Sequence, residues 1–269
     1  RWASLLLLVL LLVCLAAGFV QVFVGFRYFA GVTPMQVHVG AALVAVPLFG
    51  WHVIRHRRRQ RLHRRDMSRR ALLRTCIFAA GAAAGWLVLE GIGIWTGSPA
   101  GSRLSSGSHR LDAADIPATS WLLDDVPVLD QATHRVVVGG RTWSAAELDA
   151  LAGRQSLSVP ARLNCTSGWY ADAVWTGVPL DQLLPAAALP AAASIEVVSA
   201  TGYTRHFPIA EAGALWLVTR RDGELLGVGT GAPVRLVAPG RRGFWWVKWV
   251  AGVRLSDRPD WLQPPFPLQ

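Results

Sequence analysis

Three long apolar runs near the start of the chain constrain its fold more than any other feature. Residues 2–26 carry no charge and are mostly Leu, Val and Ala. At 1.5 Å per residue, they span the ~30 Å hydrocarbon core of a bilayer with some tilt. Residues 37–54 are also uncharged and cover roughly 27 Å, and a third apolar run occupies residues 71–95. We therefore predict three transmembrane helices within a membrane domain of residues 1–96.

The residues around these runs refine the prediction. Residues 31–34 (GVTP) look like a turn before the second helix, and Pro47 predicts a kink within that helix. The third run has Gly and Ala spacings suited to close helix packing, and it ends at Trp95 at an interface level. Glu90 lies near that end and is expected to snorkel or to pair.

A cluster of arginines separates the second and third runs. Residues 55–70 hold nine Arg and one Asp, which accounts for +8 of the net charge of +10. A short loop this rich in Arg stays on the cytoplasmic side, so everything after Thr96 is predicted to lie outside the cytoplasm in a multi-pass membrane protein. The simplest role of the cluster is contact with anionic lipid. Because the basicity is local, a nucleic-acid-binding surface explains it poorly, and no nucleic-acid partner is expected.

The end of the arginine cluster also resembles an export signal. Residues 68–73 (SRRALL) precede an apolar stretch and look like a twin-arginine signal, which exports domains already folded around a cofactor. Paired arginines before a membrane helix are also common for other reasons.

His38 and His52 lie 14 positions apart on the second predicted helix. At 100° per residue they share one face, and their axial separation of roughly 21 Å puts one imidazole near each leaflet. This arrangement is typical of membrane b-type cytochromes with two haems; the alternative is two interfacial histidines. Each haem iron needs a second His, and the other two helices contain none. The missing ligands are expected from a second protomer or from helices before Arg1, and the start at a residue other than Met favours the latter.

The remainder of the chain reads as a linker and a globular domain. Residues 97–110 are rich in Gly and Ser, which predicts a flexible linker, and residues 111–269 form the predicted extracytoplasmic domain. Three Cys residues cannot make a disulfide framework, and 13 Trp with long aliphatic runs exclude a disordered chain.

Periodicity and turn residues predict an α+β, strand-rich domain. Ser144 and Glu147 form a capping box for a short helix to about residue 152. No phosphate loop, His-Cys zinc spacing or Ser-His-Asp signature is present in the sequence. A further short helix is predicted at 180–184, and the predicted strands are 134–138 and 142–143 around a Gly-Gly turn, 156–164, 195–200, 215–219, 225–226, 234–238 and 244–255.

Cys165 is the candidate reactive residue of this domain. A lone Cys is usually a small buried hydrophobe, but this one ends a strand and enters the glycine-containing turn 166–169, where a thiolate can be presented to a soft metal. Downstream, Arg241, Arg242 and Lys248 accompany a glycine turn, an arrangement that suits a phosphate. The residue chemistry leaves two alternatives open: a thiolate-ligated, phosphate-bearing cofactor, or a core Cys beside a solvated basic loop.

Four segments around these residues resemble one family. Residues 163–169 (LNCTSGW) and 175–184 (WTGVPLDQLL) resemble the cofactor segment of the sulfite-oxidase-like molybdopterin-binding oxidoreductases. Residues 231–239 (GAPVRLVAP) and 243–249 (GFWWVKW) resemble the family's second signature in order and spacing. The resemblance covers about residues 122–257 and implies a molybdenum-molybdopterin cofactor.

The resemblance also implies roles for individual residues. Cys165 matches the thiolate that binds molybdenum beside the pterin dithiolene. Lys248, Arg241 and Arg242 match the basic loop that holds the pterin phosphate, together with Gly243. Asn164, next to the cysteine, is a candidate cofactor contact, and Arg162 and His206 are candidates for lining the substrate mouth, although a structural role is the alternative for each.

One departure from the family pattern bears on the substrate. True sulfite oxidases follow the cysteine closely with an Asn-Arg-Arg stretch, whereas residues 166–169 here are TSGW. This version is similar to a periplasmic methionine-sulfoxide reductase branch and to membrane-fused relatives, in which a four-helix cytochrome-b-like module precedes the domain. The first two predicted helices look like the last two of that module.

The sequence therefore predicts a membrane-anchored, molybdopterin-dependent oxidoreductase. It is expected to perform two-electron redox chemistry or oxygen-atom transfer on a small extracytoplasmic substrate and to exchange electrons, through b-type haem, with a membrane carrier such as a quinone or a cytochrome. The alternatives are a non-catalytic cofactor-binding or redox-sensing module and a structural anchor with a binding domain.

Overall fold

The chain divides into two units by its internal contacts, and each is described by itself. The computed structural model describes residues 2–56, 69–119 and 125–264, so the loop predicted to carry most of the arginines and the first residue of the twin-arginine pattern lie outside the described residues. The N-terminal unit consists of Arg1–Arg110 and Ser167–Trp169, and the C-terminal unit consists of Leu111–Thr166 and Tyr170–Gln269.

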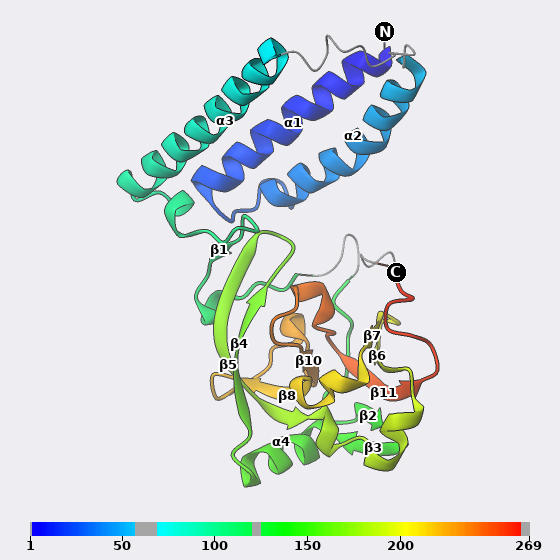
Figure 1. The fold of residues 1–269 in the computed structure, drawn as a ribbon. Coiled ribbons are helices and arrows are strands. Elements are labelled where there is room, and N and C mark those ends of the chain that lie inside the picture. The colour runs from blue at the N-terminus through cyan, green and yellow to red at the C-terminus, as the bar shows by residue number, and fades with distance from the viewer. Residues whose placement is uncertain (1, 57–68, 120–124, 265–269) are drawn as a thin grey trace. The chain divides into compact units, whose positions relative to one another are not determined.

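Three long helices dominate the N-terminal unit (Figure 1). They are α1 (Trp2–Val24), α2 (Pro34–His56) and α3 (Arg69–Trp95), and each is long and apolar enough to cross a membrane. Most of their large apolar side chains are exposed, as is expected of surfaces that face lipid.

The helix ends differ slightly from the prediction. Gly25, with a φ of +83°, ends α1 two residues early because this backbone conformation favours glycine. Pro34, predicted to lie in a turn, opens α2 instead. The Thr33 hydroxyl accepts a hydrogen bond from the amide of Gln36 at 3.2 Å, and the Gln36 side chain accepts one from the amide of Thr33 at 2.8 Å. This capping box, with proline at the first helical position, explains the earlier start.

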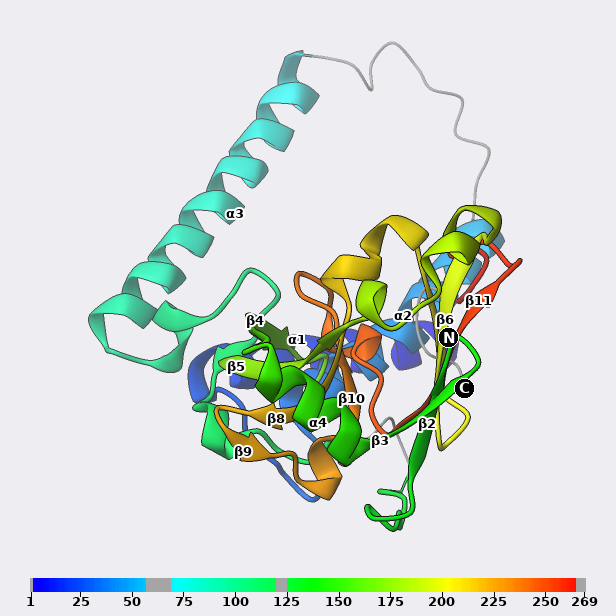
Figure 2. The same ribbon diagram turned by 90° about the horizontal axis from the view of Figure 1, so that it is seen from below.

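The three helices do not pack alike. Helices α1 and α2 pack along each other, and Pro47 lies inside α2 as predicted. In α3 only Gly93 is buried, and Figure 2 shows α3 standing apart from the other two helices. The pairing expected of Glu90 is confirmed, because Arg103 donates to its carboxylate at 3.2 Å in an ion pair.

The segment predicted to be a flexible linker has defined structure. It forms the 3-10 helix η2 (Pro99–Ser102) and the two-residue strand β1 (His109–Arg110). Ser108 and His109 are buried. Composition favoured flexibility here, but the polar groups of this segment find partners within the N-terminal unit, and those partners order it.

The C-terminal unit contains two sheets, as the α+β, strand-rich prediction requires. In the first sheet β5, β8 and β10 lie in that order, β4 pairs with β5, and β9 pairs with β8, all antiparallel. The second sheet has the order β3-β2-β11-β6-β7, and only its β2–β11 pair is parallel. The strands are β2 (Arg135–Val138), β3 (Arg141–Ser144), β4 (Ser158–Asn164), β5 (Trp169–Pro179), β6 (Ser194–Ser199), β7 (Thr204–Phe207), β8 (Trp216–Arg221), β9 (Glu224–Leu225), β10 (Arg235–Val237) and β11 (Val250–Ser256).

The single α-helix described in this unit is α4 (Ala145–Arg154), which packs against β8 (Figure 2). The predicted capping box is confirmed, with both reciprocal hydrogen bonds between Ser144 and Glu147. The short helix predicted at 180–184 is the 3-10 helix η4 (Leu180–Gln182). Other 3-10 helices are η3 (Ala113–Asp115), η5 (Ala186–Ala191), η6 (Ile209–Ala214), η7 (Val228–Thr230) and η8 (Gly243–Trp245).

The prediction of a continuous strand at 244–255 is wrong in its first half. Residues Gly243–Trp245 form η8, and Trp249 has a φ of +51°, a left-handed conformation that interrupts any strand. The strand β11 therefore begins only at Val250. The dense tryptophans that suggested a strand pack in the core instead, where Trp246 lies edge-on to Trp175 with ring centroids 5.4 Å apart.

Candidate functional site

Cys165 lies in the connection between β4 and β5. These strands pair antiparallel from Ser158 opposite Thr176 to Asn164 opposite Tyr170, so the chain reverses directly after Asn164. Cys165 is the first residue beyond the strand, as predicted, and its side chain is a partly buried thiol. A pleated pair of strands thus fixes the backbone on the incoming side of the cysteine.

The segment around Gly243 packs directly on this connection. Asn164 and Arg242 form a parallel bridge, and the Arg242 guanidinium donates to the backbone carbonyl of Cys165 at 3.5 Å. A Cβ atom at Gly243 would lie 3.1 Å from the Cα of Cys165 and 3.1 Å from the carbonyl oxygen of Asn164. That spacing is tighter than most Cβ contacts, so a side chain at this position would push the backbone of residues 164 and 165 away, and glycine allows the close approach.

Two further cations lie near Cys165: Arg235, which is buried, and Lys248, which is partly buried. Arg235 is 3% exposed, and its guanidinium donates to the Thr230 carbonyl at 2.8 Å. Burial lowers the pKa of Arg235 to about 10, and the neighbouring Cys165 opposes that change. Burial likewise lowers the pKa of Lys248 to about 7, Arg235 lowers it further, and Cys165 again opposes the change. A negative group nearby would therefore favour the charged form of Lys248 in particular.

Lys248 also connects a third segment to the site. Its ammonium donates to the carbonyl of Thr119 at 2.5 Å and to the carbonyl of Gly229 at 2.7 Å. The Thr119 hydroxyl lies 3.8 Å from the sulfur of Cys165. Thr119, Lys248 and Cys165 thus form one connected group within the C-terminal unit.

The charge around Cys165 is unbalanced. Within the part of the chain that the structure describes, Arg235, Arg242 and Lys248 take part in no ion pair with a carboxylate, and the buried Nε of Arg235 has no hydrogen-bond partner. Buried cations and an unsatisfied donor are costly unless an anion completes them. A soft sulfur ligand beside these three cations fits an anionic, metal-bearing cofactor with a phosphate.

The structure separates the two arginines that the sequence did not distinguish. Arg241 forms a bidentate ion pair with Glu211, with one contact of 2.8 Å. Its guanidinium also lies over the ring of Trp245, 4.5 Å from the centroid. Arg242 instead contacts Cys165, so it has the better geometry for a cofactor.

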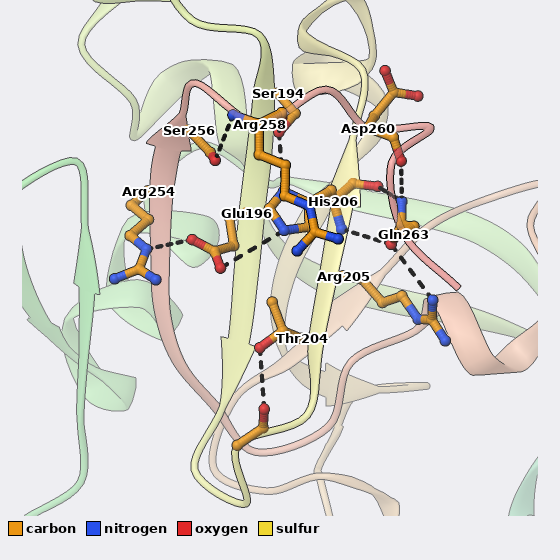
Figure 3. Close-up of polar contacts among 11 residues, drawn as sticks. Ser194, Glu196, Thr204, Arg205, His206, Arg254, Ser256, Arg258, Asp260 and Gln263 are labelled. Carbon is orange, nitrogen blue, oxygen red and sulfur yellow. Dashed lines mark hydrogen bonds and ion pairs between the residues drawn. The ribbon is translucent and has the colours of Figure 1, made fainter. Parts of the chain in front are cut away.

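Arg162 and His206, the candidates for lining the substrate mouth, have other partners. Arg162 forms an exposed bidentate ion pair with Asp172 at 2.7 and 3.0 Å. His206 is buried on β7, where its Nδ1 lies 3.0 Å from the Ser194 hydroxyl and its Nε2 lies 3.8 Å from the carboxylate of Glu196 (Figure 3). Burial lowers the pKa of His206, and Glu196 opposes that effect. These contacts favour the structural alternative for both residues.

His38 and His52, the candidate haem ligands, lie on α2, as predicted. The Nδ1 atom of His38 lies 2.7 Å from the backbone carbonyl of Cys14 on α1. Since a carbonyl only accepts, Nδ1 is the donor of this hydrogen bond. The ring of His52 lies 4.5 Å from that of His56. No group of three or more His, Cys, Asp or Glu side chains that could hold a metal ion occurs among the residues with described positions.

Sequence reasoning missed two members of the group around Cys165. Arg235 lies within residues 231–239, which resemble the family's second signature, but no role was predicted for it. A single charged residue in the apolar run 234–237 (VRLV) is unusual and is the signal that could have identified it. Thr119 carries no sequence signal, because only the fold brings it to the cysteine.

Comparison with known proteins identifies the C-terminal unit. Residues 123–262 match the family model of the oxidoreductase molybdopterin binding domain. No curated protein sequence matches the chain. Among solved structures, the chain is similar to the sulfane dehydrogenase SoxCD from Paracoccus pantotrophus, with 24% identity and a TM-score of 0.43. That match covers 49% of this chain and 40% of the other, so the chain spans less than half of that structure's length.

Proposed function

This chain belongs to the oxidoreductase molybdopterin binding domain family, and from that premise we propose that it is a molybdenum-dependent oxidoreductase with Cys165 as the protein ligand of the metal. The observation that carries the proposal is the position of the Cys165 thiol among three cations that lack carboxylate partners in the described residues. Two-electron redox chemistry or oxygen-atom transfer on a small substrate is the activity that this cofactor supplies when bound.

The residues of the chain have separate tasks in this proposal. The sulfur of Cys165 is a soft ligand and holds the metal. Lys248, Arg235 and Arg242 provide the charge-assisted hydrogen bonds that a phosphate requires. Trp175 and Trp246, buried to 0% and 2% exposure, lie near Arg235 and exclude water from the guanidinium, which strengthens its interaction with an anion.

Metal and pterin analysis of the purified chain tests the function directly. We expect about one molybdenum and one pterin phosphate for each chain, because the C-terminal unit has one cysteine, Cys165, with one group of cations around it. Substrate-dependent change of the molybdenum oxidation state would support an enzyme. Absence of both metal and pterin would contradict the proposal and favour a binding domain on a membrane anchor.

We also propose that α1, α2 and α3 cross the cell membrane, with the C-terminal unit outside. The length and hydropathy of the three helices support crossing, and the nine arginines of residues 55–70 support a cytoplasmic loop. A protease or impermeant label added outside intact cells should therefore reach residues after Thr96 and spare residues 57–65. The reversed pattern would contradict both the orientation and export by the twin-arginine route.

For electron transfer, we propose that His38 and His52 ligate b-type haem and pass electrons to a membrane carrier such as a quinone or a cytochrome. The bond from His38 to the carbonyl of Cys14 supports this role, because ligating histidines usually donate their other N–H to a carbonyl or carboxylate. Because α1 and α3 contain no His to complete each iron, the chain alone should bind little haem, whereas its dimer should show b-type haem bands that His38→Ala weakens. A spectrum without haem in a protein that carries molybdenum would leave the helices as an anchor.

A further inference from the structure

The segment directly after Cys165 belongs to the N-terminal unit. Ser167–Trp169 groups with the helices, whereas Cys165 and Thr166 group with the C-terminal unit. Trp169 is 1% exposed, and its ring lies 6.4 Å from that of Phe26 in an edge-on arrangement. Only one residue, Thr166, separates the proposed metal ligand from a segment that the helical unit holds.

The end of α1 holds this segment through Gln21. Gln21 is 2% exposed, and its side-chain amide donates to the carbonyls of Gly107 at 3.2 Å and Gly168 at 3.1 Å. The Gly168 carbonyl accepts a second hydrogen bond from the backbone amide of His109 at 3.0 Å. A buried amide on a membrane-type helix is costly unless it is bonded, so these contacts explain a polar residue here.

His109 closes the same cluster from the other side. Its Nε2 lies 2.6 Å from the carbonyl oxygen of Gln21, which is one of the last four carbonyls of α1 and has no partner within the helix. Since a carbonyl only accepts, Nε2 donates this hydrogen bond, and burial lowers the pKa of His109. One histidine therefore caps α1 with its side chain and holds Gly168 with its backbone.

The start of α2 holds the neighbouring residue. Thr33 is fully buried, and its hydroxyl donates to the carbonyl of Ser167 at 3.2 Å while it accepts from the amide of Gln36. Gly168 has a φ of +98°, and a Cβ atom there would lie 2.6 Å from the Gln21 amide nitrogen and 2.9 Å from the Cβ of Met35. The backbone of residues 167 and 168 is therefore in direct contact with the ends of both helices.

We propose that Gln21 and Thr33 are positioning residues, through which α1 and α2 set the course of the chain after Cys165 and hence the direction of its thiol. The significance for the metal rests on the proposed function, but the contacts themselves do not. A shift of α1 against α2 would reach the thiol through one residue.

The test compares Gln21→Met and Thr33→Val, alone and combined, in the full chain. Both substitutions keep the side-chain size and remove the hydrogen bond. Thr33→Ser, which keeps the hydroxyl, and Leu12→Met, at an exposed position of the same helix (56% exposed), are the matched controls. Hydrogen exchange and the alkylation rate of Cys165, read by mass spectrometry, are measured on metal-free protein.

Loss of both bonds should speed hydrogen exchange of the His109 amide and of residues 167–169 by about tenfold. The alkylation rate of Cys165 should change by about threefold or more, and the controls should behave as wild type. In metal-loaded protein, the molybdenum electron paramagnetic resonance spectrum should shift in the double variant. Exchange and alkylation equal to those of Leu12→Met would overturn the proposal. Because the first two measurements need no metal, a chain that lacks molybdenum would defeat the proposed function and leave this result standing.

Discussion

Cys165→Ser is expected to abolish molybdenum-centred redox activity while the C-terminal unit stays folded. Loss of a partner that merely orients a metal ligand lowers affinity or activity about 10–100-fold, so loss of the ligand itself should lower activity by more than about 100-fold. Serine is nearly the same size as cysteine, and Cys165 is only partly buried at the end of β4. The substitution therefore changes the hardness of the ligand and leaves the packing intact.

Substrate-dependent reduction or reoxidation of molybdenum, with a thermal unfolding curve, measures both parts of this expectation. Cys76→Ser is the matched control. Cys76 is exposed on α3, so its replacement should change neither the redox activity nor the unfolding curve. Full activity in Cys165→Ser would remove the cysteine from the metal site. An equal loss of redox activity in Cys165→Ser and Cys76→Ser would contradict a specific role of Cys165 as the metal ligand.

Removal of the buried cations should empty the cofactor site. Each charge-assisted hydrogen bond contributes ~1.5–3 kcal/mol, so Lys248→Met and Arg235→Met should each weaken retention of the pterin phosphate by about 10–150-fold. Arg242→Met should behave similarly, whereas Arg241→Met should matter less because Glu211 already neutralises Arg241. Pterin content after dialysis measures these effects.

Two comparisons make this prediction specific. Arg162→Met removes an exposed pair with Asp172 and should leave pterin content unchanged, since such pairs contribute ~0–1 kcal/mol.

Lys248 has a pKa of about 7 without the cofactor, and a phosphate favours its charged form. Binding above that pH therefore takes up a proton, and wild-type affinity should fall as the pH rises from 7 to 9. Loss of this slope in Lys248→Met would identify the titrating group, and its persistence would exclude Lys248.

Local sequence patterns predicted the elements that local forces determine. The capping box of Ser144 and Glu147 and the hairpin of β2 and β3 depend on residues close in sequence, and both form as predicted. The strand β5 was missed, although it is the longest strand described. Its two ends are buried on both faces, so the alternation that reveals a half-buried strand is confined to its middle.

The residues of the candidate site fall into two groups: those that a local sequence pattern identifies, and those that only contacts in the folded protein identify. Cys165 and Lys248 carry patterns that can be read along the chain, and the structure brings them together with Arg242. The roles of Thr119 and Gln21 could not be predicted, because each arises from a contact with residues far away in sequence. A role can be assigned to a polar residue within an apolar run, such as Gln21, only once the residue that it contacts is known.

The order of strands in the second sheet bears on how the protein is made. Its central strand, β11, is the last strand in the described residues, and it joins the pair β2–β3 to the pair β6–β7. Until the ribosome has released β11, the sheet exists only as two separate hairpins, and isolated hairpins are marginally stable in water. Contacts this distant in sequence also form slowly. The second sheet of the C-terminal unit therefore completes its folding only after β11 has emerged from the ribosome.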